Sequence, residues 1–148
     1  KRVFMKNFLL VISFLLIVSS CATTPSALST AAAVAAKPSQ ESLQSYFDLS
    51  KCIGYEFWTH NDTIPKTWHL DKDEQLKIKQ GITRFPLCSM VYYVMVDNLR
   101  GGKLHIEDEI ITPKTNRLVI FSPGKYHCVE PFIGSRTTYC VNPWDVKL

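Results

Sequence analysis

The sequence predicts an all-β domain with one short helix before it, and its strand pattern suits a double-stranded β-helix of the jelly-roll or cupin type. Two observations carry this prediction. Short segments rich in β-branched and aromatic residues follow one another from residue 54 onward. Turn-forming residues separate them at short intervals, at 61–62, 101–102, 113 and 123–124. Seven or eight short strands at such spacing fit a two-sheet barrel.

The strands that we expect follow in chain order. They are Gly54–Thr59, Trp68–Asp71, Ser89–Val96, Lys103–Ile106, Arg117–Phe121, Tyr126–Phe132 and Thr137–Val141. Ser39, which follows a proline, can cap a short helix reaching Leu49, because Leu43, Tyr46 and Phe47 then form one apolar stripe. The charged stretch 71–81 fits either a helical turn or an exposed loop.

Residues 1–21 have the layout of an export signal. Basic residues precede an apolar run from Phe8 to Val18, which is followed by small residues and Cys21. Val18-Ser-Ser-Cys21 also resembles a bacterial lipobox, in which the cysteine is lipidated; ordinary cleavage near Ala22 is the alternative. We therefore expect an exported protein, either a lipoprotein anchored in the bacterial periplasm or outer membrane, or a protein of the secretory lumen.

Residues 22–40 are mostly Ala, Ser, Thr and Pro without apolar periodicity, which predicts a disordered tether before a domain at 41–148. Four cysteines remain in that domain, and export would place them in an oxidising compartment. Cys128 and Cys140 flank the segment that carries Arg136, which favours them slightly as a pair. Buried free thiols are an equal alternative.

Charge argues against a nucleic-acid partner. The chain has 17 basic and 13 acidic residues, but Lys1, Arg2 and Lys6 belong to the leader, so 14 basic groups face 13 acidic ones beyond it. We expect contact with a membrane only through the N-terminal signal or its lipid.

Three residues form a candidate metal-ligand set, namely His69, Asp71 and His127. Two imidazoles and a carboxylate can hold Fe(II) on one face and leave other positions open for chemistry. In an extended segment His69 and Asp71 point to the same side, and a distant strand can supply His127. Arg136 adds a guanidinium fork that suits the carboxylate of a dicarboxylic co-substrate.

A second His-x-Asp, His60-Asn61-Asp62, satisfies the same spacing, but it lies in a stretch rich in turn residues. Arg136 has an alternative as well, because it could be a solvated strand residue that pairs with Glu130 or Asp145. His69 and Asp71 could likewise be a polar surface pair.

The run from Gly54 to Trp144 resembles an iron(II)- and 2-oxoglutarate-dependent dioxygenase of the prolyl 4-hydroxylase-like group. The motifs that carry the likeness are Trp68-His-Leu-Asp-Lys-Asp-Glu74, Gly101-Gly-Lys-Leu-His-Ile106, Asn116–His127, and then Pro131, Gly134, Arg136 and Asn142-Pro-Trp144. The resemblance implies that His69, Asp71 and His127 bind Fe(II). It also implies that Arg136 binds the far carboxylate of 2-oxoglutarate, with O2 as the other co-substrate and ascorbate as a candidate reductant.

Two further residues are candidates for contact with 2-oxoglutarate. Thr138 lies two residues beyond Arg136, so it shares a strand face and can add a hydroxyl hydrogen bond. Alternation places only one of Tyr92 and Tyr93 inside the barrel, and related enzymes use a tyrosine here; we favour Tyr92.

The activity implied is hydroxylation of an unactivated C–H, of a prolyl or other peptide residue or of a small molecule, with release of succinate and CO2. A non-catalytic β-sandwich lipoprotein that binds or scaffolds, and retains such a pocket, is the alternative. A metal-dependent cupin isomerase is a third candidate, but it leaves Arg136 unexplained. The sequence does not identify the primary substrate.

Overall fold

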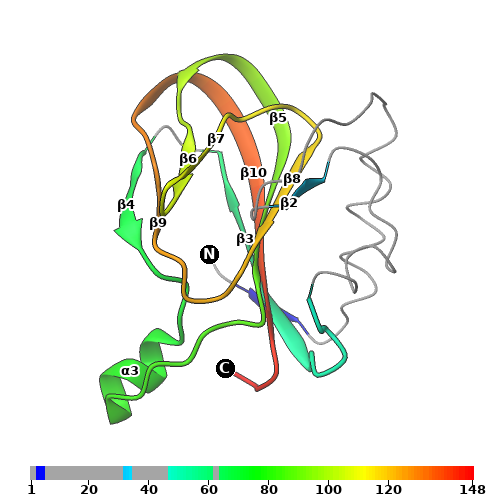
Figure 1. The fold of residues 1–148 in the computed structure, drawn as a ribbon, viewed down its shortest axis with the longest axis vertical. Helices are drawn as coiled ribbons and strands as arrows, with labels where there is room; N and C mark the ends of the chain where they lie inside the picture. The colour runs from blue at the N-terminus through cyan, green and yellow to red at the C-terminus, as the bar shows by residue number, and fades with distance from the viewer. Residues whose placement is uncertain (1–2, 6–31, 35–46, 62–63) are drawn as a thin grey trace.

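The computed structural model describes residues 3–5, 32–34, 47–61 and 64–148. These residues form two antiparallel sheets and a short helix (Figure 1). The larger sheet has the strand order β1-β3-β10-β5-β8-β2, and the smaller has the order β4-β9-β6-β7. The elements are β1 Val3–Met5, β2 Ala32–Val34, β3 Gly54–His60, β4 Lys66–His69, α3 Glu74–Gln80, β5 Ser89–Gly101, β6 Leu104–Ile106, β7 Glu109–Ile111, β8 Arg117–Phe121, β9 His127–Val129 and β10 Phe132–Trp144.

The all-β prediction is confirmed, and the strand bounds differ in instructive ways. Strands β5 and β10 are both longer than predicted because they pair with each other from Phe132↔Gly101 to Val141↔Met90. The predicted strand 126–132 is interrupted at Pro131, whose nitrogen carries no hydrogen for a sheet bond. Strand β7 was not predicted, since three residues show too little alternation to be recognised.

Two apolar clusters lie on opposite faces of the larger sheet, and alternation along its strands sorts residues between them. Tyr93, Val119 and Phe121 pack with residues of β6 and β7, so this cluster lies between the two sheets. Tyr92 and Leu118, their immediate neighbours in sequence, pack on the other face. The larger sheet is therefore buried on both faces around β5 and β8.

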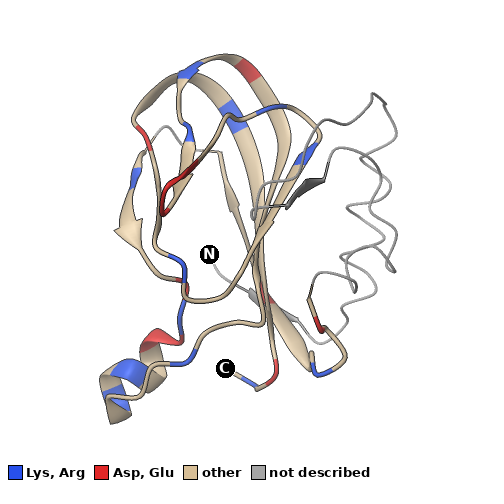
Figure 2. Ribbon diagram, viewed as in Figure 1, with Lys and Arg blue, Asp and Glu red and all other residues tan. Residues whose placement is uncertain are grey.

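The helix lies at 74–80, where the sequence left a helical turn and a loop both open. Asp73 caps it by accepting a hydrogen bond from the Leu76 amide at 2.8 Å, and Gly81 ends it in the left-handed conformation with φ of 72°. None of its residues is buried. In Figure 2 it carries both basic and acidic residues.

The helix predicted to end at Leu49 is wrong at its C-terminal end, because residues 47–49 are not helical. The Asp48 carboxylate accepts a hydrogen bond from the Ser50 amide at 3.0 Å, a local turn that competes with helix formation. Residues 39–46 lie outside the described part of the chain.

Two short strands come from the segments predicted to be leader and tether. Strand β1 pairs with β3, and β2 pairs with β8. The other residues of 1–40 lie outside the described part, so the division at residues 21 and 40 stays a prediction. Within the described residues no helix has the length and apolar character needed to span a membrane.

None of the four cysteines of the domain, Cys52, Cys88, Cys128 and Cys140, forms a disulfide bond. The pairing of Cys128 with Cys140 is therefore not formed. Cys128 belongs to β9 in the smaller sheet, opposite His105, whereas Cys140 belongs to β10 in the larger sheet. The segment between them crosses from one sheet to the other instead of closing a hairpin.

Candidate metal site and adjoining pocket

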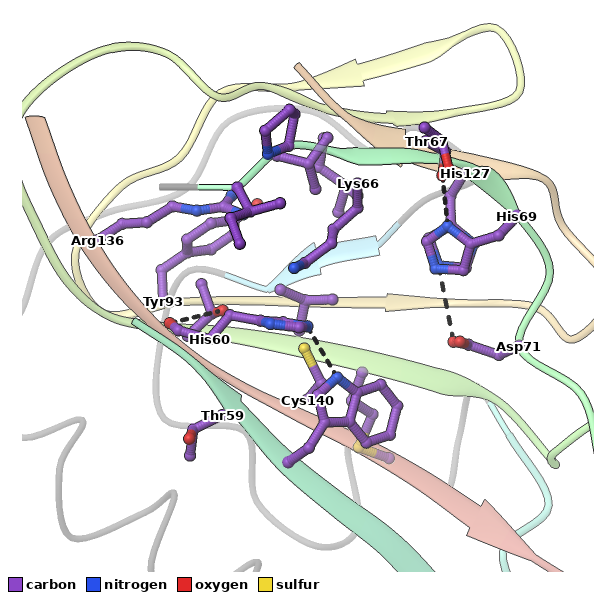
Figure 3. A pocket seen from close by; sticks show the side chains of 18 residues that line it. Thr59, His60, Lys66, Thr67, His69, Asp71, Tyr93, His127, Arg136 and Cys140 are labelled. Carbon is purple, nitrogen blue, oxygen red and sulfur yellow. Dashed lines mark hydrogen bonds and ion pairs between the residues drawn. The ribbon is translucent and has the colours of Figure 1, made fainter. Parts of the chain in front are cut away.

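The pairing of two short strands brings the histidines of the candidate site together. Strands β4 and β9 are antiparallel, and His69 lies directly opposite His127, with 4.2 Å between the ring centroids. Asp71 follows β4 by two residues, and its Oδ2 lies 3.8 Å from His127 Nε2. One donor atom from each of the three residues lies within 4.8 Å of the others. Figure 3 shows the three side chains gathered at one end of a pocket.

Backbone carbonyls orient both imidazoles. The Nδ1 atoms of His69 and His127 lie 2.7 Å from the Thr67 carbonyl oxygen and 3.0 Å from the Lys125 carbonyl oxygen, respectively. Because a carbonyl oxygen only accepts, each Nδ1 carries the hydrogen and donates a hydrogen bond to it, which leaves Nε2 with the lone pair for a metal. This is how metal-binding histidines are commonly oriented in proteins. The donor set thus fits a divalent transition metal such as Fe(II).

Asp71 and His127 are held by buried neighbours. The Ser89 hydroxyl, at the start of β5, donates to Asp71 Oδ2 at 2.7 Å, and Ser89 is 3% exposed. The rings of Phe121 and His127 pack edge to face, with 4.9 Å between their centroids. Burial lowers the pKa of His127, and this effect outweighs the opposing charge of Asp71. The imidazole is therefore neutral at pH 7, which is the form that binds a metal.

The three residues open into a pocket of about 600 Å³ between the sheets. Arg136, on β10, also lines this pocket, and Figure 3 shows it on the far side from the two histidines. Its guanidinium is buried, lies 4.6 Å from the centroid of the Phe132 ring and donates to the Gly102 carbonyl at 3.4 Å. The solvated alternative for Arg136 is wrong, since the residue is 4% exposed. Glu130 pairs with His105 at 2.6 Å.

His60, the described member of the second His-x-Asp, is not part of the metal-ligand group found among the described residues. His60 lies at the end of β3, and its Nε2 accepts a hydrogen bond from Trp58 Nε1 at 3.0 Å. It lines another wall of the same pocket. Asp62 lies outside the described residues, and among those described the metal-ligand group contains His69, Asp71 and His127 alone.

The choice between the two tyrosines needs correction. Tyr93 lines the pocket, whereas Tyr92 belongs to the cluster on the opposite face and donates to Asn116 Oδ1 at 2.9 Å. Tyr93 is fully buried, and its hydroxyl has no hydrogen-bond partner among the described residues. Burial raises the pKa of Tyr93 to about 12, so the hydroxyl stays a donor. Thr138 lines the pocket as expected from its shared face with Arg136.

Ser89, Phe132 and Lys66 are the residues near the site that the sequence did not reveal. Lys66 lines the pocket from β4, and Figure 3 draws its side chain between Arg136 and the histidines. No local motif marks any of the three. Their positions depend on strand pairing that only the folded chain shows.

No protein-family model and no curated protein sequence matches the chain. Among solved structures, it is similar to an oxidoreductase of the 2OG-Fe(II) oxygenase family from Burkholderia pseudomallei, with a TM-score of 0.51 and 13% identity over 72% of this chain. The chain spans about half of that protein, 50% of its length. It also matches a cupin-2 domain containing protein from Shewanella frigidimarina with a TM-score of 0.40 and 13% identity, covering 60% of this chain and 70% of that one. The chain therefore has the jelly-roll fold of the 2OG-Fe(II) oxygenase that it matches.

Proposed function

We propose that this protein is an Fe(II)- and 2-oxoglutarate-dependent oxygenase that hydroxylates an unactivated C–H bond. One observation carries the proposal. His69, Asp71 and His127 converge at one end of a pocket whose opposite side presents the buried Arg136. A metal-ligand set that leaves positions open, next to a fixed cation suited to a carboxylate, fits a co-substrate that both chelates a metal and carries a second acid group.

Each side chain has a role that follows from its position. The Nε2 atoms of the two histidines and one Asp71 oxygen would hold the ion. Ser89, which donates to Asp71 Oδ2, would keep the carboxylate in place. The bound ion, together with O2 and 2-oxoglutarate, would supply the oxidising chemistry, and the protein would orient these groups and exclude competing reactions.

The remote carboxylate of 2-oxoglutarate would meet three donors. Arg136 provides a charged fork, and the hydroxyls of Thr138 and Tyr93 line the same pocket. Because these groups are buried, their attraction to an anion is stronger than it would be in water. Tyr93 takes the place that we had expected for Tyr92.

The pocket leaves room for a second molecule beside the co-substrate. Its volume of about 600 Å³ falls in the usual range for ligand pockets, roughly 300–1,000 Å³. A five-carbon diacid fills only part of it. We propose a peptide residue, such as a prolyl residue, or a small molecule as the primary substrate.

The experiment that tests the proposal is an anaerobic titration with Fe(II) followed by 2-oxoglutarate. We expect a metal-to-ligand charge-transfer absorption when both are present. On admission of air with ascorbate as reductant, we expect O2 uptake and succinate formation. His127→Ala should abolish all three signals. His105→Ala is the matched control, because His105 lies on the neighbouring strand and pairs with Glu130 outside the pocket.

Arg136→Ala separates the two halves of the site, because it should weaken binding of 2-oxoglutarate while Fe(II) binding persists. Equal loss of both would contradict the role assigned to Arg136. Tight metal binding without charge transfer or turnover would indicate a binding or scaffold protein. Turnover that ignores O2 would indicate an isomerase.

We further propose that the protein is exported and anchored through Cys21. The support is the signal-like order of residues 1–21. Mass spectrometry of the mature N-terminus tests this: a diacylated Cys21 is expected, and a free N-terminus at residue 22 would leave export without the lipid.

A further inference from the structure

Between Arg136 and the aromatic residue that holds it, β10 runs beside a bulge in β5. The pairing of β10 with β5 shifts register between Ile133 and Ser135. Gly134 lies between them with φ of +97°, and a Cβ added there would come 2.3 Å from the Asn98 carbonyl oxygen. Only glycine satisfies both conditions, so the local path of β10 depends on this residue.

Phe132 and Arg136 lie on either side of Gly134 in β10, and their side chains meet. In a regular strand, the Cα atoms of residues four apart are separated by about 13 Å. Their side chains must therefore lean toward each other to make contact. Here the guanidinium carbon lies 4.6 Å from the centroid of the Phe132 ring. Both residues are buried, at 9% and 4% exposure. The ring face therefore meets a desolvated cation, the setting in which this attraction is strongest.

Gly102 completes the support from the turn after β5. Its carbonyl oxygen accepts from Arg136 Nη1 at 3.4 Å. A Cβ at Gly102 would lie 3.1 Å from the Phe132 Cβ, so the absence of a side chain lets the aromatic residue pack closely on this turn. One ring and one carbonyl thus restrict the rotation of the guanidinium before any ligand arrives.

Phe132 is not among the residues that line the pocket. Its ring contacts the pocket-lining Arg136. We propose that Phe132 is a positioning residue, which presets Arg136 and thereby determines the preference for a 2-oxo acid with a second carboxylate over one without it. This inference rests on the proposed function, and it identifies what selects the co-substrate.

The physical reason is preorganisation. An arginine side chain has many rotamers, and fixing it on binding would reduce affinity. Where the fork is already held, the incoming carboxylate forms its paired hydrogen bonds without that loss. Removing the ring should therefore weaken the contact with the second carboxylate and leave chelation of the metal by the 2-oxo acid end unchanged.

The test compares two ligands on Fe(II)-loaded protein without O2, namely 2-oxoglutarate and 2-oxopentanoate, which has the same chain length but no second carboxylate. Phe132→Leu and Phe132→Met keep an apolar side chain and remove the ring. We expect 2-oxoglutarate to bind about tenfold more weakly, with no change for 2-oxopentanoate or Fe(II). Phe132→Tyr should restore the wild-type affinity, because it keeps the aromatic face.

Phe57→Leu is the matched control. Phe57 also packs against a ring, that of Tyr139 at 5.4 Å, but it does not line the pocket. It should leave both affinities unchanged. Equal weakening of both ligands in the Phe132 variants, or no change in either, would overturn the role of Phe132. Failure of wild-type protein to form any complex with Fe(II) and 2-oxoglutarate would overturn the proposed function, and this inference with it.

Discussion

Replacing Ser89 by alanine tests whether the site is supported from β5. The hydroxyl donates to Asp71 Oδ2 at 2.7 Å, and both side chains are shielded from water. A hydrogen bond to a charged group contributes about 1.5–3 kcal/mol. At about 1.4 kcal/mol for each factor of ten, its loss should weaken metal binding roughly 10- to 100-fold. That range agrees with the roughly 10–100-fold effects typical of residues that support metal ligands.

The assay is anaerobic calorimetry with Fe(II), and with Co(II) as a stable substitute. Ser135→Ala is the control, since Ser135 is an exposed serine on β10 outside the pocket. Asp71→Ala sets the lower limit by removing the carboxylate. If Ser89→Ala bound metal as tightly as wild type while Asp71→Ala did not bind it, the orientation of the carboxylate would not depend on Ser89, and the reasoning would be refuted.

Three further predictions concern stability and thiol reactivity. At pH 8 iodoacetamide should label the partly exposed Cys128 before the fully buried Cys88. Peptide mass spectrometry measures the two labelling rates, and unfolding in urea should make them equal. Equal labelling of the folded protein would contradict the burial of Cys88. Burial raises the pKa of Cys88 from 9.0 to about 12, so the folded thiol keeps a proton that the unfolded chain releases. The free energy of unfolding should therefore fall as pH rises above 9, and less steeply in Cys88→Ala; parallel slopes would argue against it. Gly134→Ala should lower that free energy by about 2 kcal/mol or more in urea titrations, because of its positive φ and the clash with Asn98, and a neutral result would mean that the bulge relaxes.

The candidate ligands could be predicted because their chemistry is local in sequence. His69 and Asp71 are two residues apart. His127, with Arg136 nine residues later, matches the motif of the dioxygenases that the sequence resembles. The structure brings these residues to one pocket. The strand content could also be predicted, since strands β5, β8 and β10 are rich in β-branched and aromatic residues.

The features that were not predicted correctly depend on pairing between distant strands. The pocket-facing tyrosine follows from the register of β5 against β8, where Tyr93 lies opposite Arg117. A shift of one residue would exchange the faces, and nothing within Tyr92-Tyr93 reveals which applies. Ser89 and Phe132 went unnoticed for a similar reason. Ser89 contacts Asp71, and Phe132 contacts Arg136, only in the folded sheet.

The place of β4 in the smaller sheet has a consequence for folding. It has four residues and an irregular register between Lys66 and His69, and among the described strands it pairs with β9 alone. Such a strand is expected to open at a lower free energy than the central strands. A metal ion bound by both His69 and His127 would link β4 to β9. Metal binding would then stabilise the pairing of β4 with β9 as well as complete the candidate site.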